Sequence, residues 1–196
     1  MPFNDDITAI TQFIIELEKL KKVERRVKPV GLTRYENSAE HSGHIALLAL
    51  TLSRFASQPV DELKIVTMLL LHDIVEIDTG DKFAYDANHD DFANEHQAAI
   101  RLFGLLPPSL GQKFLLLWEE FEQAQSPEAQ FAKAIDRLMP VLQNLHNGCQ
   151  SWLDHGITVK QILKKNAAIE QANPELWQWL RRQVIEKAKI VGLQAE

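Results

Sequence analysis

An apolar segment that ends abruptly in two ionisable residues places the strongest constraint on the fold of this chain. Residues 65–71 are almost entirely apolar, and His72 and Asp73 follow them directly. If this segment is a buried helix, its inner end brings an imidazole and a carboxylate into the protein interior. Glu76 lies four residues after His72 and three after Asp73, so all three side chains can face one site while the helix lasts. The alternative is a helix that runs into solvent, with both residues on the surface.

Apolar residues recur at spacings of three and four along most of the chain, which is the period of an amphipathic helix. A first helix is predicted from residue 7 to the charged run 19–26, and Ser38 is the expected N-cap of a second, which extends to about residue 56. Further helices are predicted from Asp61 through the apolar segment, over 91–103, 109–123 and 126–147, and from Thr158 and Asn173 onward. The segment 82–90 shows little periodicity and is predicted to be irregular.

The chain shows no strand alternation, no internal repeat and no linker that would separate a second domain. It contains 45% hydrophobic and 24% charged residues, a balance that allows a sizeable core. The sequence therefore predicts an all-α fold with a single domain over residues 1–196.

Charge and cysteine content exclude several classes of function. The net charge of −6 is unlike that of a protein that binds nucleic-acid polymers, although a small phosphorylated ligand needs only a local cation or metal. Cys149 is the only cysteine, so neither a disulfide framework nor a thiolate zinc cluster is expected. The sequence has no signal-peptide pattern and no apolar run near the ~18 residues that cross a bilayer. We therefore expect no membrane partner and a cytoplasmic location.

Two further ionisable residues stand within predicted helices. His41 lies in the first turn of the second helix, and Asp136 lies between apolar neighbours of a long helix. Taken singly, His41 can be a surface histidine and Asp136 can pair with a nearby cation in water. Together with His72 and Asp73 they supply two imidazoles and two carboxylates from three helices. This ligand set suits one divalent ion, and Mn²⁺, Fe²⁺, Co²⁺ or Zn²⁺ better than Ca²⁺.

The ordered set His41, His72-Asp73 and Asp136 resembles the HD-domain superfamily of metal-dependent phosphohydrolases. These are all-helical proteins that bind their metal through those four residues, so the resemblance implies an HD-type helical bundle. The wider stretches 36–42, 72–81, 134–140 and 148–152 look like the branch that contains the 5′-deoxynucleotidases. The resemblance covers nearly the whole chain.

The resemblance also implies an activity and roles for individual residues. The chain is expected to be an enzyme that removes phosphate from (deoxy)nucleoside 5′-monophosphates with one divalent ion, Mn, Co, Fe or Zn. Glu76 and Asp81 would be its catalytic carboxylates, and Arg34 would bind the phosphate. The alternatives are a solvated loop cation for Arg34 and a turn residue for Asp81, which follows Gly80. Lys82 is better interpreted as a solvated lysine.

Other functions in the same superfamily fit less well. Guanosine tetraphosphate hydrolases place adjacent Glu-Asp after the His-Asp pair, where this chain has Glu76 and Ile77. Cyclic-dinucleotide phosphodiesterases carry a Gly-Tyr-Pro element, which is absent here, and the dNTP triphosphohydrolases are much longer chains. The remaining alternative is a non-catalytic HD domain that binds a nucleotide or a partner and keeps the metal for stability.

The last predicted helix, residues 174–191, has an apolar arc wider than one core face requires. The arc includes Trp177 and Trp179, and tryptophan is favoured at interfaces. This pattern predicts a homodimer, although the same residues can instead cover the core.

Overall fold

The computed structural model describes residues 3–86 and 92–196, and within these ranges the chain is helical, without a strand. Glu24 and Asn37 form an isolated antiparallel β-bridge. The main helices are α1 (Phe3–Glu16), α2 (Ser38–Leu52), α3 (Glu62–Leu71), α4 (Glu76–Thr79), α5 (Phe92–Phe103), α6 (Pro108–Gln123), α7 (Pro127–His146), α9 (Val159–Asn166) and α11 (Pro174–Val191). The predicted all-α class is confirmed.

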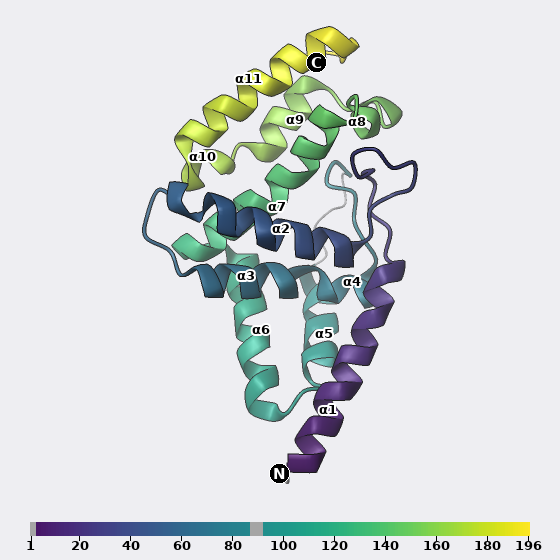
Figure 1. Ribbon diagram of the computed structural model, residues 1–196, viewed down its shortest axis with the longest axis vertical. Coiled ribbons are helices and arrows are strands. Elements are labelled where there is room, and N and C mark those ends of the chain that lie inside the picture. The colour runs from purple at the N-terminus through teal and green to yellow at the C-terminus, as the bar shows by residue number, and fades with distance from the viewer. Residues whose placement is uncertain (1–2, 87–91) are drawn as a thin grey trace.

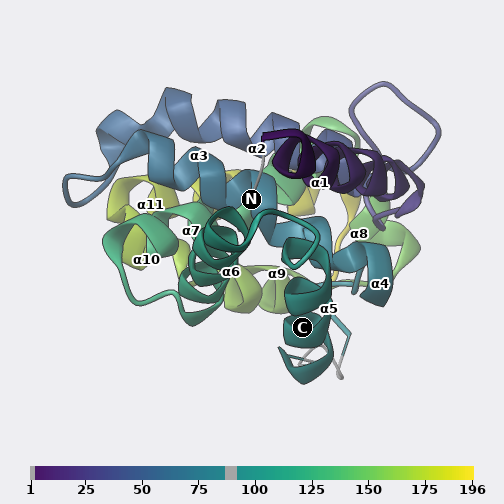
Figure 2. The same ribbon diagram turned by 90° about the horizontal axis from the view of Figure 1, so that it is seen from below.

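The helices are arranged around α2, α3 and α7. Figure 1 shows α2 and α3 side by side across the middle of the molecule, with α5 and α6 below them and α9 and α11 above. Figure 2 shows α1, α2 and α3 together on one face of the fold. The first and last helices lie at opposite ends of the long axis (Figure 1).

The buried apolar side chains form two clusters that meet at the end of α3. Met68 and Leu69 belong to the first cluster, together with buried residues of α2, α7, α9 and α11. Leu71 and Ile74 belong to the second, together with buried residues of α1, α5 and α6. The polar pair that follows Leu71 therefore lies at the junction of two apolar cores, which is why it is buried.

The structure differs from the predictions at several element ends. The N-cap of α2 is Asn37 rather than Ser38: the Asn37 side chain accepts from the Glu40 backbone, and the Glu40 side chain accepts from the Asn37 backbone. The helix predicted through Glu76 changes pitch, because residues 72–75 form the 3₁₀ segment η3 (His72–Val75) before α4 begins.

Short helical elements outside the prediction complete the fold. They are η1 (Leu17–Lys22), η2 (Ser53–Phe55), α8 (Gln150–Asp154) and α10 (Ile169–Ala172). Of the segment predicted to be irregular, residues 82–86 form no helix, whereas residues 87–90 lie outside the described residues.

The last helix, α11, buries most of its apolar arc within the protein. Trp177, Leu180 and Val184 are buried in the core, whereas Trp179 and Ile185 are 39% and 36% exposed. The exposed part of the arc is thus narrower than the sequence suggested, and the homodimer stays a prediction. Among the described residues, no helix combines the length and apolar character needed to cross a membrane.

Candidate functional site

Four ionisable side chains from three parts of the fold meet at the end of α3. Asp136 Oδ1, from α7, lies 2.9 Å from His41 Nε2 and 3.6 Å from His72 Nε2. Asp73 Oδ1 lies 2.8 Å from the same His72 nitrogen. His41, His72 and Asp73 are buried, and each offers a ligand atom within 4.8 Å of the others. The structure thus brings together all four residues that the sequence indicated as metal ligands.

The hydrogen bonds of His72 show that this cluster fits a cation. Its Nδ1 lies 2.8 Å from the Leu69 carbonyl, which can only accept, so Nδ1 carries the hydrogen. Nε2 faces the carboxylates of Asp73 and Asp136 and has no hydrogen-bond partner. In the neutral form of the ring, which is the form that binds a metal, the Nε2 lone pair points at these carboxylates, which are also acceptors. A divalent ion between these acceptors would satisfy all of them, which is the usual arrangement of a metal-binding histidine.

The protonation behaviour of the cluster leads to the same conclusion. Burial lowers the pKa of His72, but the neighbouring carboxylates of Asp73 and Asp136 outweigh burial and raise this pKa well above its ordinary value. Burial raises the pKa of Asp136, but His41 and His72 outweigh it and hold this pKa well below its ordinary range. The cluster therefore attracts positive charge, and His41, His72 and Asp73 are positioned to bind a metal ion.

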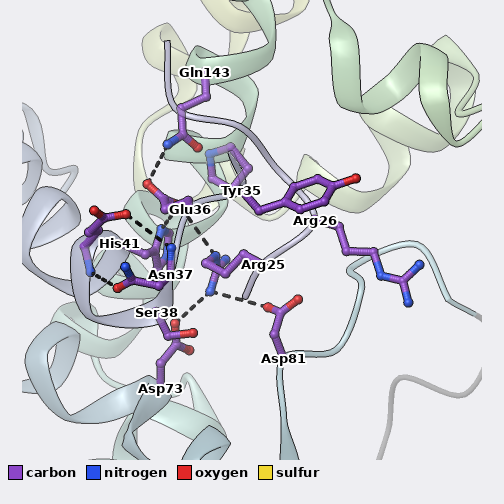
Figure 3. A network of polar contacts seen from close by, with 12 residues as sticks. Arg25, Arg26, Tyr35, Glu36, Asn37, Ser38, His41, Asp73, Asp81 and Gln143 are labelled. Carbon is purple, nitrogen blue, oxygen red and sulfur yellow. Dashed lines mark hydrogen bonds and ion pairs between the residues drawn. The ribbon is translucent and has the colours of Figure 1, made fainter. Parts of the chain in front are cut away.

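Arg25 lies beside this cluster, a position that the sequence analysis did not predict. Its Nη1 lies 2.7 Å from Asp73 Oδ2 and 3.6 Å from Asp81 Oδ1, and its Nε lies 3.7 Å from Glu36 Oε2 (Figure 3). Burial lowers the pKa of Arg25, but the surrounding carboxylates, Asp73 foremost, outweigh burial and raise it. A permanently charged guanidinium thus lies next to the proposed metal ligands.

The backbone explains why Arg25 turns inward. The Arg25 N–H donates to the Glu36 carbonyl at 2.9 Å, and the Glu36 N–H donates to the Val27 carbonyl at 2.9 Å. These two bonds fix the chain on either side of Arg25 against the segment that leads into α2. Glu36 is itself buried, receives a hydrogen bond of 2.6 Å from Gln143 and lies 3.3 Å from His41 Nδ1 (Figure 3).

Glu76 and Asp81, the predicted catalytic carboxylates, both line the cavity at this cluster. Burial, with the nearby charge of Asp73, raises the pKa of Glu76 well above its ordinary value, although Glu76 also accepts a hydrogen bond from the Ser38 hydroxyl. Burial likewise raises the pKa of Asp81, against the opposing effect of Arg25. Carboxylates with raised pKa values are suited to proton transfer near neutral pH.

The structure does not bring Arg34 to this site. Arg34 is exposed and forms a two-bond ion pair with Glu40, with N–O distances of 2.7 and 2.5 Å. It is absent from the lining of the cavity, whereas Arg25 is part of that lining and contacts the cluster through Asp73. The phosphate-binding role of Arg34 stays a prediction that its position in the structure does not favour.

A cavity of about 670 Å³ adjoins the cluster, which is within the range of small-molecule sites. One part of its wall carries the ionisable groups already described. The rest includes the aromatic side chains of Phe83, Tyr85 and Trp152. The cavity therefore has room for an apolar ring system as well as a phosphate.

Relatives of known name match about two thirds of the chain. A zebrafish (Danio rerio) protein named 5′-deoxynucleotidase HDDC2 is 28% identical over 135 residues, which cover 67% of this chain and 66% of that protein. The human (Homo sapiens) protein of the same name is 28% identical over 138 residues, covering 69% of this chain and 66% of that protein. The matched part is therefore slightly less than two thirds of the length of these relatives.

Solved structures and a family model extend the comparison. A protein described as a predicted metal-dependent phosphohydrolase, from Magnetospirillum magnetotacticum, is 38% identical, with a TM-score of 0.91 over 98% of this chain and 100% of that one. A Pyrococcus horikoshii protein, 20% identical, shares the fold with a TM-score of 0.66 over 88% of this chain and 99% of its own. The model of the HD domain matches residues 17–177. Together with the four converging ligands, these matches show that the chain belongs to the HD domain family.

Proposed function

We propose that the chain is a metal-dependent phosphomonoesterase that removes phosphate from (deoxy)nucleoside 5′-monophosphates. One observation carries the proposal: a buried arginine and two carboxylates of raised pKa line one cavity beside the four candidate ligands. A structural metal site would need neither the arginine nor the two carboxylates. The names of the HDDC2 relatives support the nucleotide substrate.

The residues divide the reaction between them. A divalent ion held by His41, His72, Asp73 and Asp136 would lower the pKa of water and stabilise charge on the phosphate. Glu76 orients the attacking water and takes up its proton, and its raised pKa makes it a stronger base than an ordinary glutamate.

Two further residues act on the substrate itself. Arg25 binds the phosphate through its planar guanidinium, which its neighbours keep charged. Asp81 donates a proton to the departing sugar oxygen, and its raised pKa preserves the protonated form that this step needs.

A phosphate-release screen tests the activity directly. The protein would be stripped of metal and assayed on nucleotides with Mn²⁺, Co²⁺, Mg²⁺ and Zn²⁺ supplied separately. We expect phosphate release from 5′-monophosphates with at least one of these ions and none without metal. If metal binds and no nucleotide is hydrolysed, the alternative of a non-catalytic nucleotide- or partner-binding domain takes the place of the proposal.

The two arginines can be separated by substitution. Arg25→Gln is expected to raise KM for a 5′-monophosphate by about tenfold or more, because a charge-assisted contact with the phosphate is lost. Arg34→Gln is expected to leave KM within about twofold, because Arg34 is exposed and paired with Glu40. Steady-state kinetics of both variants provide the measurement. If KM rises in Arg34→Gln and not in Arg25→Gln, then Arg34 rather than Arg25 binds the phosphate.

The role of Asp81 is tested with two leaving groups. Asp81→Asn is expected to slow release from deoxyadenosine 5′-monophosphate by roughly 10²–10⁴-fold, because the departing alkoxide needs a proton. Release from p-nitrophenyl phosphate should fall far less, since its leaving group departs without one. The ratio of the two kcat values gives the result. Equal slowing of both substrates would mean that another residue is the leaving-group acid.

A further inference from the structure

The wall of the cavity formed by α7 and α9 carries a second group of cations. Lys133 and Arg137 lie four residues apart on α7, and therefore on one face of that helix, and Lys165 joins them from α9. Burial lowers the pKa of Lys165, and the charges of Arg137 and Lys133 lower it further, whereas Asp136 opposes them. The three cations are thus close enough to repel one another.

Three of the six Lys and Arg side chains that line the cavity pair with an acid, but two on this wall do not. Lys82 pairs with Glu95 at 2.8 Å, and Lys133 pairs with Glu122 at 3.0 Å. Arg25 pairs with Asp73, as described above. Within residues 3–86 and 92–196, by contrast, no carboxylate forms an ion pair with Arg137 or Lys165. Like charges gathered without a partner raise the energy of the protein unless an anion binds there.

This pair is separate from the cation beside the metal ligands. Arg25 comes from the segment before α2, whereas Arg137 and Lys165 come from α7 and α9. The cavity of about 670 Å³ that contains both groups is far larger than one phosphate. Its lining also includes Phe83, Tyr85 and Trp152, aromatic side chains that suit a nucleoside. The cavity can therefore hold two anionic groups at once, one at the metal ligands and one at Arg137 and Lys165.

We propose that Arg137 and Lys165 form a second anion subsite, and that the preferred substrates are phosphomonoesters whose leaving group carries a second phosphate. An arginine offers paired donors to phosphate and a lysine adds a point charge, so together they suit a dianion. The inference rests on the proposed function, because it names the substrate class of that same cavity. The second phosphate takes no part in the hydrolysis and contributes binding alone.

The test compares substrates that share one 5′-phosphate. Deoxyadenosine 3′,5′-bisphosphate and adenosine 2′,5′-bisphosphate, which carry the second phosphate on different sugar oxygens, are each assayed against the corresponding 5′-monophosphate. Chromatography of the products identifies which phosphate has been removed. The proteins are the wild type, Lys165→Gln, Arg137→Gln and, as a matched control, Lys164→Gln, which changes an exposed lysine of α9 outside the cavity lining.

We expect at least one bisphosphorylated probe to exceed the monophosphate in kcat/KM with the wild type. Lys165→Gln and Arg137→Gln should each lower this ratio on the order of tenfold, the usual consequence of losing one charge-assisted contact. Lys164→Gln should keep the wild-type ratio. If neither probe is preferred, or if both cavity variants keep the wild-type preference, the second subsite is refuted while the monophosphatase activity stands.

A binding measurement separates failure of the subsite from failure of the proposed function. Quenching of tryptophan fluorescence reports ligand binding, since Trp152 lies in the cavity wall. If no substrate is hydrolysed but a bisphosphorylated probe binds more tightly than the monophosphate in a Lys165-dependent way, the subsite is supported and the hydrolase proposal is not. Equal binding of the bisphosphates and the monophosphates by wild type and Lys165→Gln would refute the subsite whatever the activity.

Discussion

Replacing Asp73 with alanine is expected to abolish both metal binding and phosphate release. One oxygen of this carboxylate faces His72 Nε2 at 2.8 Å, so the substitution removes one of four ligands and leaves an incomplete shell. The activity should fall to background, a larger effect than the loss of any single proton-transfer group. Elemental analysis of the dialysed protein measures the metal content, and phosphate release measures the activity.

Two further variants show whether this loss is specific. Asp73 also balances the buried Arg25, so its removal can weaken folding, because an unpaired buried charge costs about 3–5 kcal/mol. Asp73→Asn keeps the side-chain volume, and a thermal melt shows whether the variant is folded when its metal is gone. Asp78→Ala breaks an ion pair with Arg101 outside the cavity lining and should retain metal and activity. Full metal occupancy in Asp73→Asn would exclude Asp73 as a ligand.

Replacing Glu76 with glutamine is expected to lower kcat by roughly 10²–10⁴-fold while the metal remains bound. Glutamine keeps the shape of the side chain and its contact with Ser38, but it cannot accept a proton from water. The metal content should equal that of the wild type, which distinguishes this variant from Asp73→Ala. Full activity in Glu76→Gln would show that the proposed mechanism is wrong even if the metal ligands are correct.

The same variant has an expected effect on stability that serves as an internal check. The pKa of Glu76 lies well above its ordinary value in the folded protein and returns to that value on unfolding. At a pH between the folded and the unfolded pKa, unfolding therefore releases a proton, and the stability falls as the pH rises. Ionisation of Glu76 therefore lowers the stability of the metal-free protein above its ordinary pKa. Metal-free Glu76→Gln should consequently melt at a higher temperature than the wild type near neutral pH, and the difference should shrink in acid.

The meeting of the four candidate ligands could be predicted from the set and not from its members taken singly. His72 and Asp73 end an apolar run, whereas His41 and Asp136 each also suit a surface position. The helices could be predicted from caps such as Ser126 and Asn173, which accept backbone hydrogen bonds in the structure as expected. The all-α class followed from these local rules, and the family comparison confirms it.

Arg25 could not be predicted in the same way. It lies within the charged run 19–26, which continues past the end of η1, and this pattern indicates a solvated surface. What turns it inward is backbone pairing with Glu36, which is a long-range contact with no signal near Arg25 itself. The resemblance implied the phosphate-binding role for Arg34, but in the structure Arg34 pairs with Glu40 rather than with a residue of the cluster.

The N-cap of α2 shows a related limit of local rules. Ser38 and Asn37 are both good caps, and the sequence alone does not decide between them. The structure uses Asn37, which leaves the Ser38 hydroxyl to donate to Glu76 from a distant part of the chain. The short helices α8 and α10 were missed for another reason, because elements of four or five residues are too short to show a helical period.

The two oxygens of Asp73 have separate partners, and this division has a thermodynamic consequence. Oδ1 faces His72 where the metal would bind, whereas Oδ2 is held by Arg25 at 2.7 Å. Under the proposed role of Arg25, a phosphate that draws this arginine away would leave more of the carboxylate charge for the metal, so phosphate would strengthen metal binding. Linkage is reciprocal, and the metal would strengthen phosphate binding by the same factor. The proposal therefore implies that the metal-loaded protein holds phosphate more tightly than the metal-free protein, and that the rate of product release depends on the strength of metal binding.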